Sequence, residues 1–390
     1  MSLTIQQLLC DMVQMGASDL HVKAGNVPGF RIDGGVQPMP DYGALTPESS
    51  ADLCRQLMTP EQWERFQCER DLDFSYALPN VARFRVNALV QRSSMGMVIR
   101  QIPDTIPNAQ QLGLPQICLD FAAKPRGLVL VTGPTGSGKS TTLAAMLDWI
   151  NENESGHILT MEDPLEFVHN DKKCFVTQRQ IGQDTQSFRE GLRRALRQDP
   201  DVILIGEMRD LETISMAITA AETGHLVFGT LHTTSAISTV DRIVDVFPTD
   251  AQQQVRVQLS GTLQGVISQT LVPKIGGGRC AAREVLVATD AVRSLIREAK
   301  TAQMLNLMQT GRAHGMSTLE DQLLQLVADQ LITPDDAISK ANRPEDVRKR
   351  LAENPPRPAA GVGAGAGAGA GGAAGRFAPR PGTPNRFARR

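Results

Sequence analysis

The sequence has few aromatic residues, no closely spaced cysteines and no long apolar run. Aromatic residues make up 4% of the 390 positions, so the chain offers few rings on which single-stranded nucleic acid could stack. Its six cysteines are scattered, which predicts free thiols in a reducing cytosol rather than a zinc or disulfide framework. No apolar run approaches the ~18 residues that span a bilayer, and the first ten residues do not resemble a secretory signal. These absences predict a cytoplasmic protein whose membrane contact is peripheral.

The charge is nearly balanced overall but unevenly distributed. Forty Lys and Arg residues oppose 42 Asp and Glu residues, which leaves a net charge of −2. After Glu353 the chain has six arginines and no acidic residue, so the remaining body has 34 basic and 42 acidic residues and a charge of −8. Because non-specific binding to nucleic acid comes mainly from neutralised phosphates, an acidic body predicts no specific nucleic-acid partner.

Residues 1–105 are predicted to form a small α+β domain. An amphipathic run from Leu3 to Val13 indicates a first helix that ends near Gly16, and Thr46 and Pro47 indicate the start of a second helix. Alternating apolar and polar residues predict five strands, at Asp19–Lys23, Phe30–Ile32, Leu72–Tyr76, Val81–Val86 and Met97–Arg100. Several prolines follow, which predicts an interdomain linker over residues 106–126.

From Gly127 the pattern changes to apolar strands that alternate with helices, which predicts a second domain over residues 127–288. The strands are expected at Leu128–Val131, His157–Met161, Val202–Ile205 and Leu226–Phe228. Such strands with helical crossovers indicate an α/β fold, with a parallel sheet covered on both faces. After the glycines at 276–278 we expect helices, with a C-terminal helical region over 289–352. Residues 353–390, rich in Pro, Gly, Ala and Arg, predict a disordered tail.

A complete phosphate-binding loop is the strongest functional signal. Its residues match the pattern G-x-x-x-x-G-K-[ST] between an apolar strand and a helical pattern. The glycines let backbone N–H groups turn toward phosphates, and the following helix adds its positive N-terminus. We expect Lys139 to reach the β- and γ-phosphates of a nucleoside triphosphate and Ser140 to hold Mg²⁺. The predicted nucleotide-binding residues are Gly133, Pro134, Thr135, Gly136, Ser137, Gly138, Lys139, Ser140 and Thr141.

Acidic residues follow two of the predicted strands. Glu207 comes after the strand at 202–205, and P-loop proteins place such a carboxylate beside the metal. Glu162, Asp163 and Glu166 cluster after the strand at 157–161, at the edge where ligands bind in open α/β sheets. Neighbouring carboxylates repel one another unless a cation or base shares them. The cluster suits a Mg²⁺–triphosphate site, and a solvated acidic loop would have the same composition.

Two histidines and three arginines are weaker candidates. His225 and His232 bracket the predicted strand at 226–228 and would point to opposite sides of an unbroken strand, so they need not share a role. Ordinary packing explains them as well as a function does. Arg83, Arg85 and Arg100 lie on predicted strands of the first domain, where a solvated strand face is the simpler explanation.

In these motifs the chain resembles the secretion-type hexameric ATPases, and within them the retraction motors of type IV pili. The resemblance runs from about Leu8 to Ala341. It is carried by the segment Gly16–His21, the phosphate-binding loop, an aspartate box at 160–169, a Walker B stretch at 199–210 and a histidine box at 223–234. It implies a RecA-like P-loop domain preceded by a smaller, PAS-like α+β domain and followed by a C-terminal helical region.

The resemblance also implies roles for the candidate residues. Glu166 would be the general base, and Glu207 would hold Mg²⁺ together with Ser140. His225 and His232 would couple the state of the phosphates to the position of the subunit. An arginine of the first domain would reach the γ-phosphate bound by a neighbouring subunit, the candidates being Arg83, Arg85 and Arg100.

Arginines supplied by a neighbour imply a homohexameric ring that binds ATP and Mg²⁺. By resemblance, this ring would act on the inner-membrane platform protein at the base of the pilus, and a paralogous retraction ATPase could be a second partner. The segment Ala291–Glu298 resembles a helix needed for retraction, whereas the tetracysteine zinc insertion of the extension motors is absent. Three alternatives remain at this point: an accessory retraction ATPase, a non-hydrolysing nucleotide-binding regulator and a DNA-translocating motor.

Overall fold

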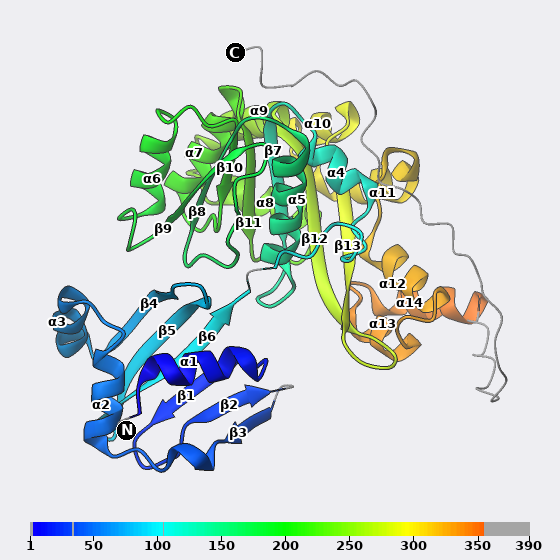
Figure 1. Cartoon of the computed structure of the whole chain (residues 1–390). Coiled ribbons are helices and arrows are strands. Elements are labelled where there is room, and N and C mark those ends of the chain that lie inside the picture. The colour runs from blue at the N-terminus through cyan, green and yellow to red at the C-terminus, as the bar shows by residue number, and fades with distance from the viewer. Residues whose placement is uncertain (1–2, 33–34, 104, 355–390) are drawn as a thin grey trace. The chain divides into compact units, whose positions relative to one another are not determined.

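The computed structural model describes residues 3–32, 35–103 and 105–354, which form two units (Figure 1). The first unit runs to Thr105 and includes the short segment Glu166–Val168, and the second unit begins at Ile106. The arginines of the predicted tail lie outside the described residues. No helix in the described part of the chain has the length and apolar character needed to cross a bilayer.

The first unit is an antiparallel six-stranded sheet with helices on one face (Figure 1). Its strand order is β3-β2-β1-β6-β5-β4. Because side chains alternate along each strand, one face carries the apolar core, including Leu20, Phe84 and Ile99. The five predicted strands and both predicted helices are present. The elements are α1 (Ile5–Gln14), β1 (Asp19–Lys23), β2 (Gly29–Ile32), β3 (Gly35–Pro38), η1 (Pro40–Tyr42), α2 (Pro47–Arg55), α3 (Pro60–Glu69), β4 (Asp71–Leu78), β5 (Ala82–Gln91) and β6 (Ser94–Ile102).

The second unit is built on a seven-stranded sheet in the order β13-β12-β7-β11-β10-β8-β9. All neighbouring strands are parallel except the β12–β13 pair. Alternate residues of β7 enter two different cores, Leu128 in one and Val129 in the other, so both faces are covered. Its elements are α4 (Gln116–Ala122), β7 (Gly127–Thr132), α5 (Lys139–Asn153), β8 (His157–Glu162), β9 (Phe175–Gln180), α6 (Phe188–Ala195), β10 (Val202–Ile205), α7 (Leu211–Glu222), β11 (Leu226–Leu231), α8 (Ala236–Asp245), α9 (Gln252–Thr262), β12 (Leu263–Pro273) and β13 (Arg279–Val287).

The expectation that helices follow the glycines at 276–278 was wrong, because β13 comes first. Gly276, Gly277 and Gly278 all have positive φ and form the turn of a hairpin, which requires such residues. Helices begin only at Asp290. They are α10 (Asp290–Arg297), η2 (Thr301–Gln303), α11 (Met304–Thr310), η3 (Gly311–His314), α12 (Leu319–Ala328), α13 (Pro334–Lys340) and α14 (Pro344–Glu353).

One buried carboxylate joins the sheet to helices α8 and α12. Glu284 of β13 is 5% exposed and accepts hydrogen bonds from the backbone N–H groups of Ala236, at 2.6 Å, and Leu319. These two residues begin α8 and α12. Burial raises the pKa of Glu284, and the hydrogen bonds oppose that shift. Glu284 therefore acts as a shared cap for two helix N-termini.

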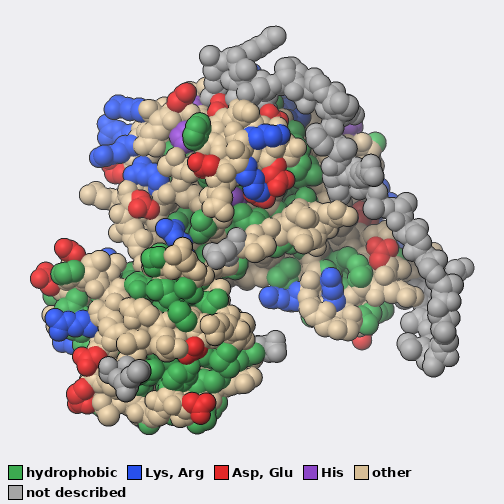
Figure 2. Space-filling model, viewed as in Figure 1, with side chains coloured by type: hydrophobic (Ala, Val, Ile, Leu, Met, Phe, Trp, Pro, Cys, Tyr) green, Lys and Arg blue, Asp and Glu red, His purple; other side chains and the backbone are tan. Residues whose placement is uncertain are grey.

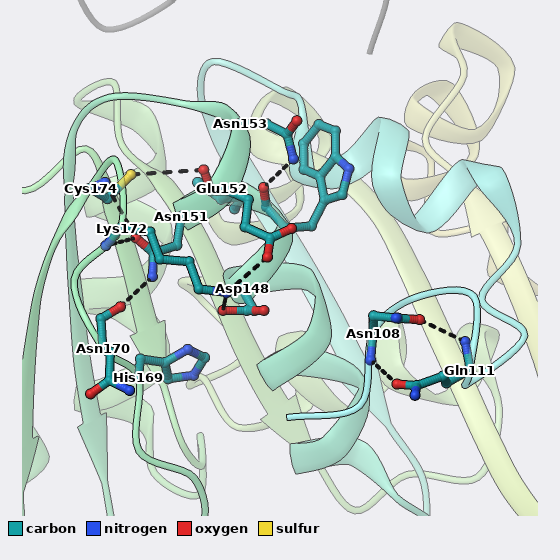
Figure 3. Close-up of polar contacts among 12 residues, drawn as sticks. Asn108, Gln111, Asp148, Asn151, Glu152, Asn153, His169, Asn170, Lys172 and Cys174 are labelled. Carbon is teal, nitrogen blue, oxygen red and sulfur yellow. Dashed lines mark hydrogen bonds and ion pairs between the residues drawn. The ribbon is translucent and has the colours of Figure 1, made fainter. Parts of the chain in front are cut away.

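The predicted linker over residues 106–126 belongs instead to the second unit. Asn108 and Gln111 close a turn by reciprocal side-chain to backbone hydrogen bonds of 2.8 Å (Figure 3). Helix α4 then buries Cys118, Leu119 and Phe121 in the same core as β7 and α5. The prolines of this stretch therefore separate short ordered pieces and do not mark a free connection.

The contact between α4 and β12 predicts a large effect of one added methyl group. A Cβ at Gly265 would lie 2.1 Å from the Phe121 ring, and overpacking of a core costs about 1–3 kcal/mol. We therefore expect Gly265→Ala to lower the free energy of unfolding by about 2 kcal/mol in urea titrations. Gly261→Ala is the matched control, because nothing lies within 4 Å of a Cβ at that position. Equal stability of the two variants would contradict this packing.

Candidate functional site

The phosphate-binding loop joins β7 to α5 at the carboxyl end of a central strand of the sheet. Gly133 has a φ of +142° and lies against the backbone of β12, since a Cβ would come within 2.2 Å of the Gln269 carbonyl oxygen. Gly138 has a φ of +86° and caps α5. Helix α5 is 15 residues long and begins at Lys139, so its first N–H groups and its positive end face the loop. This geometry suits an anion such as a phosphate.

Lys139 folds back over the loop that precedes it. Its ammonium group donates to the carbonyl oxygens of Gly133, at 2.9 Å, and Pro134, at 3.2 Å. Burial lowers the pKa of Lys139, and the nearby Glu207 carboxylate opposes that shift. Ser140 and Thr141 follow in the first turn of α5, with Ser140 exposed. The nine predicted nucleotide-binding residues therefore form one continuous loop and helix start.

Glu207 lies at the same edge of the sheet, just after β10. Its Oε1 accepts from His232 Nε2 at 2.9 Å and pairs with the Arg209 guanidinium. Burial alone would raise the pKa of Glu207, but Arg209 and His232 outweigh it and hold the pKa below its usual range. The carboxylate is therefore ionised near neutral pH. The structure brings Lys139, Glu207 and His232 together.

The aspartate box begins at the end of β8. Glu162 is 8% exposed and accepts from the Thr160 hydroxyl at 2.7 Å. Asp163 interacts electrostatically with Arg209, which links the box to the Glu207 cluster. Glu166, in contrast, lies in the three-residue segment that groups with the first unit. Glu166 and the phosphate-binding loop therefore belong to different units.

The loop after the aspartate box is fastened to α5 (Figure 3). Asn151 of α5 is fully buried, and its amide donates to the Asn170 carbonyl oxygen at 2.7 Å and accepts from the Lys172 N–H at 3.0 Å. The Lys172 ammonium pairs with Asp148 at 2.7 Å. Burial lowers the pKa of His169 to about 4, so this imidazole is neutral at pH 7. The helix that starts at the phosphate-binding loop therefore also positions the loop that follows the acidic residues.

The two candidate histidines lie at opposite ends of β11. His232 follows the strand, whereas His225 precedes it and bonds to its own turn, through the Ala220 carbonyl oxygen at 2.9 Å. The His225 carbonyl oxygen accepts from the N–H of Gly127, at the start of β7. Six strand residues separate the two histidines, a distance of about 20 Å. The second unit therefore does not bring His225 to its own phosphate-binding loop.

The three candidate arginines lie on the face of the first sheet that is opposite its helices. Arg100 donates to Asp19 at 2.7 Å, and Arg85, which faces Arg100 across the strands, lies 3.8 Å from Asp73. Arg83 is exposed. Asp19 is 3% exposed, and although burial would raise its pKa, bonds from Ser18 and Arg100 lower it. A buried, ionised carboxylate thus holds the exposed Arg100.

The donor atoms at the phosphate-binding loop suit Mg²⁺ that arrives with a nucleotide. Within the described ranges, no cluster of three or more His, Cys, Asp or Glu residues could hold a metal ion. Mg²⁺ in such sites takes most of its ligands from phosphates and water and only one or two from protein oxygens. The Ser140 hydroxyl and the ionised Glu207 carboxylate are oxygen donors of that kind. The residues therefore fit the predicted ion.

Two residues of the site were not singled out by the sequence. Arg209 stands two positions after Glu207, but nothing in the pattern assigns it to that carboxylate. Gln269 of β12 donates to the Ser137 carbonyl oxygen at 2.7 Å from 132 residues further along the chain. Only the pairing of β12 with β7 places Gln269 beside the loop, and a local pattern carries no such signal.

Basic side chains gather around α6 on the surface of the second unit (Figure 2). Two of the α6 arginines are paired with acids: Arg189 lies 3.0 Å from Glu212, and Arg194 lies 3.6 Å from Glu190. These pairs reduce the positive charge that this surface can offer to a phosphate backbone.

Known proteins are similar to this chain in sequence and in fold. The model of the family described as type II/IV secretion system protein matches residues 1–343. PilT, the type IV pilus retraction ATPase of Pseudomonas aeruginosa, is 54% identical over 342 residues, which span 88% of this chain and 99% of PilT. PilU, a type IV pilus ATPase of the same organism, is 41% identical and covers 88% of this chain and 90% of PilU. The crystal structure of the retraction motor PilT with bound ADP superposes with a TM-score of 0.85 at 48% identity, covering 89% of this chain and 99% of that structure.

Proposed function

Because this chain belongs to the type II/IV secretion system protein family, we propose that it is the ATPase that powers retraction of type IV pili. The observation that carries the proposal is the cluster of Lys139, Glu207 and His232 in a chain that matches PilT over nearly its whole length. The lower identity to PilU favours a primary rather than an accessory retraction motor.

The candidate residues would serve different steps of phosphoryl transfer. The N–H groups of the loop and the Lys139 ammonium bind the phosphates and stabilise their charge. Ser140 and Glu207 would hold Mg²⁺, which neutralises phosphate charge when bound. His232 bonds to Glu207 at 2.9 Å and would therefore respond to changes at that carboxylate. Glu166 would accept the proton of the attacking water.

The same mechanism needs a positive charge from a neighbouring subunit, and hence a homohexameric ring. Arg83, Arg85 and Arg100 are the candidates. Arg100 is favoured, because the buried Asp19 holds it while 68% of its side chain stays exposed. His225 lies at the other edge of the sheet. It would therefore respond to a nucleotide bound by a neighbouring subunit and not to the nucleotide bound by its own phosphate-binding loop.

The ring would work in the cytoplasm, peripherally at the inner membrane. There its partner would be the platform protein of the pilus, and a paralogous retraction ATPase could work beside it. A regulator that binds nucleotide without hydrolysing it is the second candidate of a different class. The pairing of Glu207 with His232 and the acidic residues of the aspartate box disfavour that alternative. An assay of Mg²⁺-dependent ATP hydrolysis separates the two.

Deletion of the gene tests the proposed function. We expect the deletion strain to keep surface pili and to lose twitching motility, because pili would assemble but not retract. Expression of the wild-type gene from a plasmid should restore twitching, whereas expression of the Lys139→Ala variant should not. Continued twitching in the deletion strain would contradict a primary retraction motor and favour the accessory role.

A further inference from the structure

Gln269 of β12 touches the phosphate-binding loop and the helix that follows it. Its side chain is 3% exposed. The amide nitrogen donates to the Ser137 carbonyl oxygen at 2.7 Å, and the amide oxygen accepts from the Thr142 hydroxyl at 3.0 Å. The backbone carbonyl of Gln269 also packs against Gly133. One residue of a neighbouring strand thus contacts the start of the loop, its end and the first turns of α5.

The orientation of this amide follows from its partners. The Ser137 carbonyl oxygen can only accept a hydrogen bond, so the NH₂ group of Gln269 must face it. The Thr142 hydroxyl then meets the amide oxygen and donates to it. Thr142 is 2% exposed, so the hydroxyl is held in place. Turning the amide over would lose the bond to Ser137 and place the amide oxygen against the Ser137 carbonyl oxygen, which cannot donate.

The bond to Ser137 sets the direction of an N–H group in the loop. In a trans peptide the C=O and the following N–H point in opposite directions. When Gln269 holds the Ser137 carbonyl, the N–H of Gly138 therefore points away from β12. Gly138 has a φ of +86°, and glycine at such a position allows the peptide to rotate freely. A phosphate cradle needs its N–H groups to converge on the anion.

We infer that Gln269 is a positioning residue of the nucleotide site, which orients the Ser137–Gly138 peptide for phosphate binding. The inference rests on the proposed function, because it assigns this residue to the same nucleotide. Gln269 does not touch the phosphates and acts through Ser137 and Thr142.

A pair of variants on one strand tests the inference. Gln269→Met keeps the size of the side chain and removes both hydrogen bonds. We expect the Kd for Mg²⁺–ADP, measured by calorimetry on the full chain, to rise about tenfold, the effect of one well-placed hydrogen bond. Gln264→Met is the matched control, because Gln264 also lies on β12 and donates to a backbone carbonyl, that of Arg126 at 3.1 Å, at the opposite end of the strand. Its Kd should change less than twofold.

Unfolding in urea without nucleotide separates positioning from stability. A purely structural role would lower the unfolding midpoint of Gln269→Met and leave the Kd of the folded protein unchanged. That result, or an equal rise in Kd for Gln264→Met, would overturn the inference.

A second pair of variants covers the case in which Gln269→Met does not fold. Thr142→Val removes the hydroxyl that holds the amide, whereas Thr142→Ser keeps it. We expect about a threefold weaker affinity for Mg²⁺–ADP with Val and an unchanged affinity with Ser. Equal affinities of the two would overturn the inference. Absence of ADP binding by the wild type would instead contradict the proposed function.

Discussion

Lys139→Ala is expected to reduce ATP hydrolysis by a factor of about 10² to 10³, the effect of removing one preorganised charge from a reaction that develops negative charge. The lysine follows the loop at the start of α5, and its ammonium group already lies at the Gly133 and Pro134 carbonyl oxygens. No other lysine belongs to this loop or to the first turn of α5. Release of phosphate from Mg²⁺–ATP by the purified full chain is the measurement.

The control for this variant is Lys300→Ala. Lys300 is exposed and is paired with Glu298 at 2.8 Å, outside the phosphate-binding loop and the loop that α5 positions. Its loss should change hydrolysis less than twofold and leave the unfolding midpoint close to that of the wild type. Wild-type turnover in Lys139→Ala would contradict the assignment of the phosphate site.

Glu207→Gln is expected to lower kcat by a factor of about 10² or more and to leave ADP affinity within a few-fold of the wild type. The amide has the size of the carboxylate but lacks the negative charge that Arg209 and His232 stabilise. Binding energy from the loop and Lys139 is untouched, so the loss should fall on the chemical step. Steady-state hydrolysis and calorimetry with Mg²⁺–ADP measure the two effects separately.

Glu212→Gln provides the comparison for Glu207→Gln. Glu212 lies five positions further along the chain in α7 and forms a surface pair with Arg189 at 3.0 Å, and such pairs contribute about 0–1 kcal/mol. Its kcat should equal that of the wild type. If Glu207→Gln also hydrolysed ATP at the wild-type rate, the carboxylate would have no part in the reaction.

Local features of the chain were predictable from the sequence because they depend on local chemistry. Gly133 to Ser140 form a loop and a helix start wherever such a pattern follows a buried strand, and Thr46 before Pro47 caps α2 as its sequence suggests. Five strands of the first sheet and four strands of the second followed from their apolar patterns, whereas β3, β9, β12 and β13 were not predicted. The placement of His225 and His232 at the two ends of β11 also followed, since both residues flank one strand.

Features that depend on long-range pairing were not predictable. Gln269 reaches Ser137 only because β12 pairs with β7, and Asp19 meets Arg100 only through the register of β1 and β6. The position of Arg100 on a predicted strand suggested a solvated strand face, and its side chain is exposed. Its partner, however, is a buried carboxylate 81 residues away. A local pattern contains neither strand order nor register. The ordered stretch with α4 was missed for the same reason, because Phe121 packs on a glycine of β12.

The shared cap at Glu284 has a mechanical consequence for the motor. Helix α8 starts shortly after His232, and α12 starts the last group of helices, so one carboxylate anchors the ends of both. An N–H group that loses a buried acceptor costs about 1–3 kcal/mol, which resists any separation of these helices. A displacement of the loop at His232 that moved α8 would therefore also move α12. The C-terminal helices would then shift together with the nucleotide site.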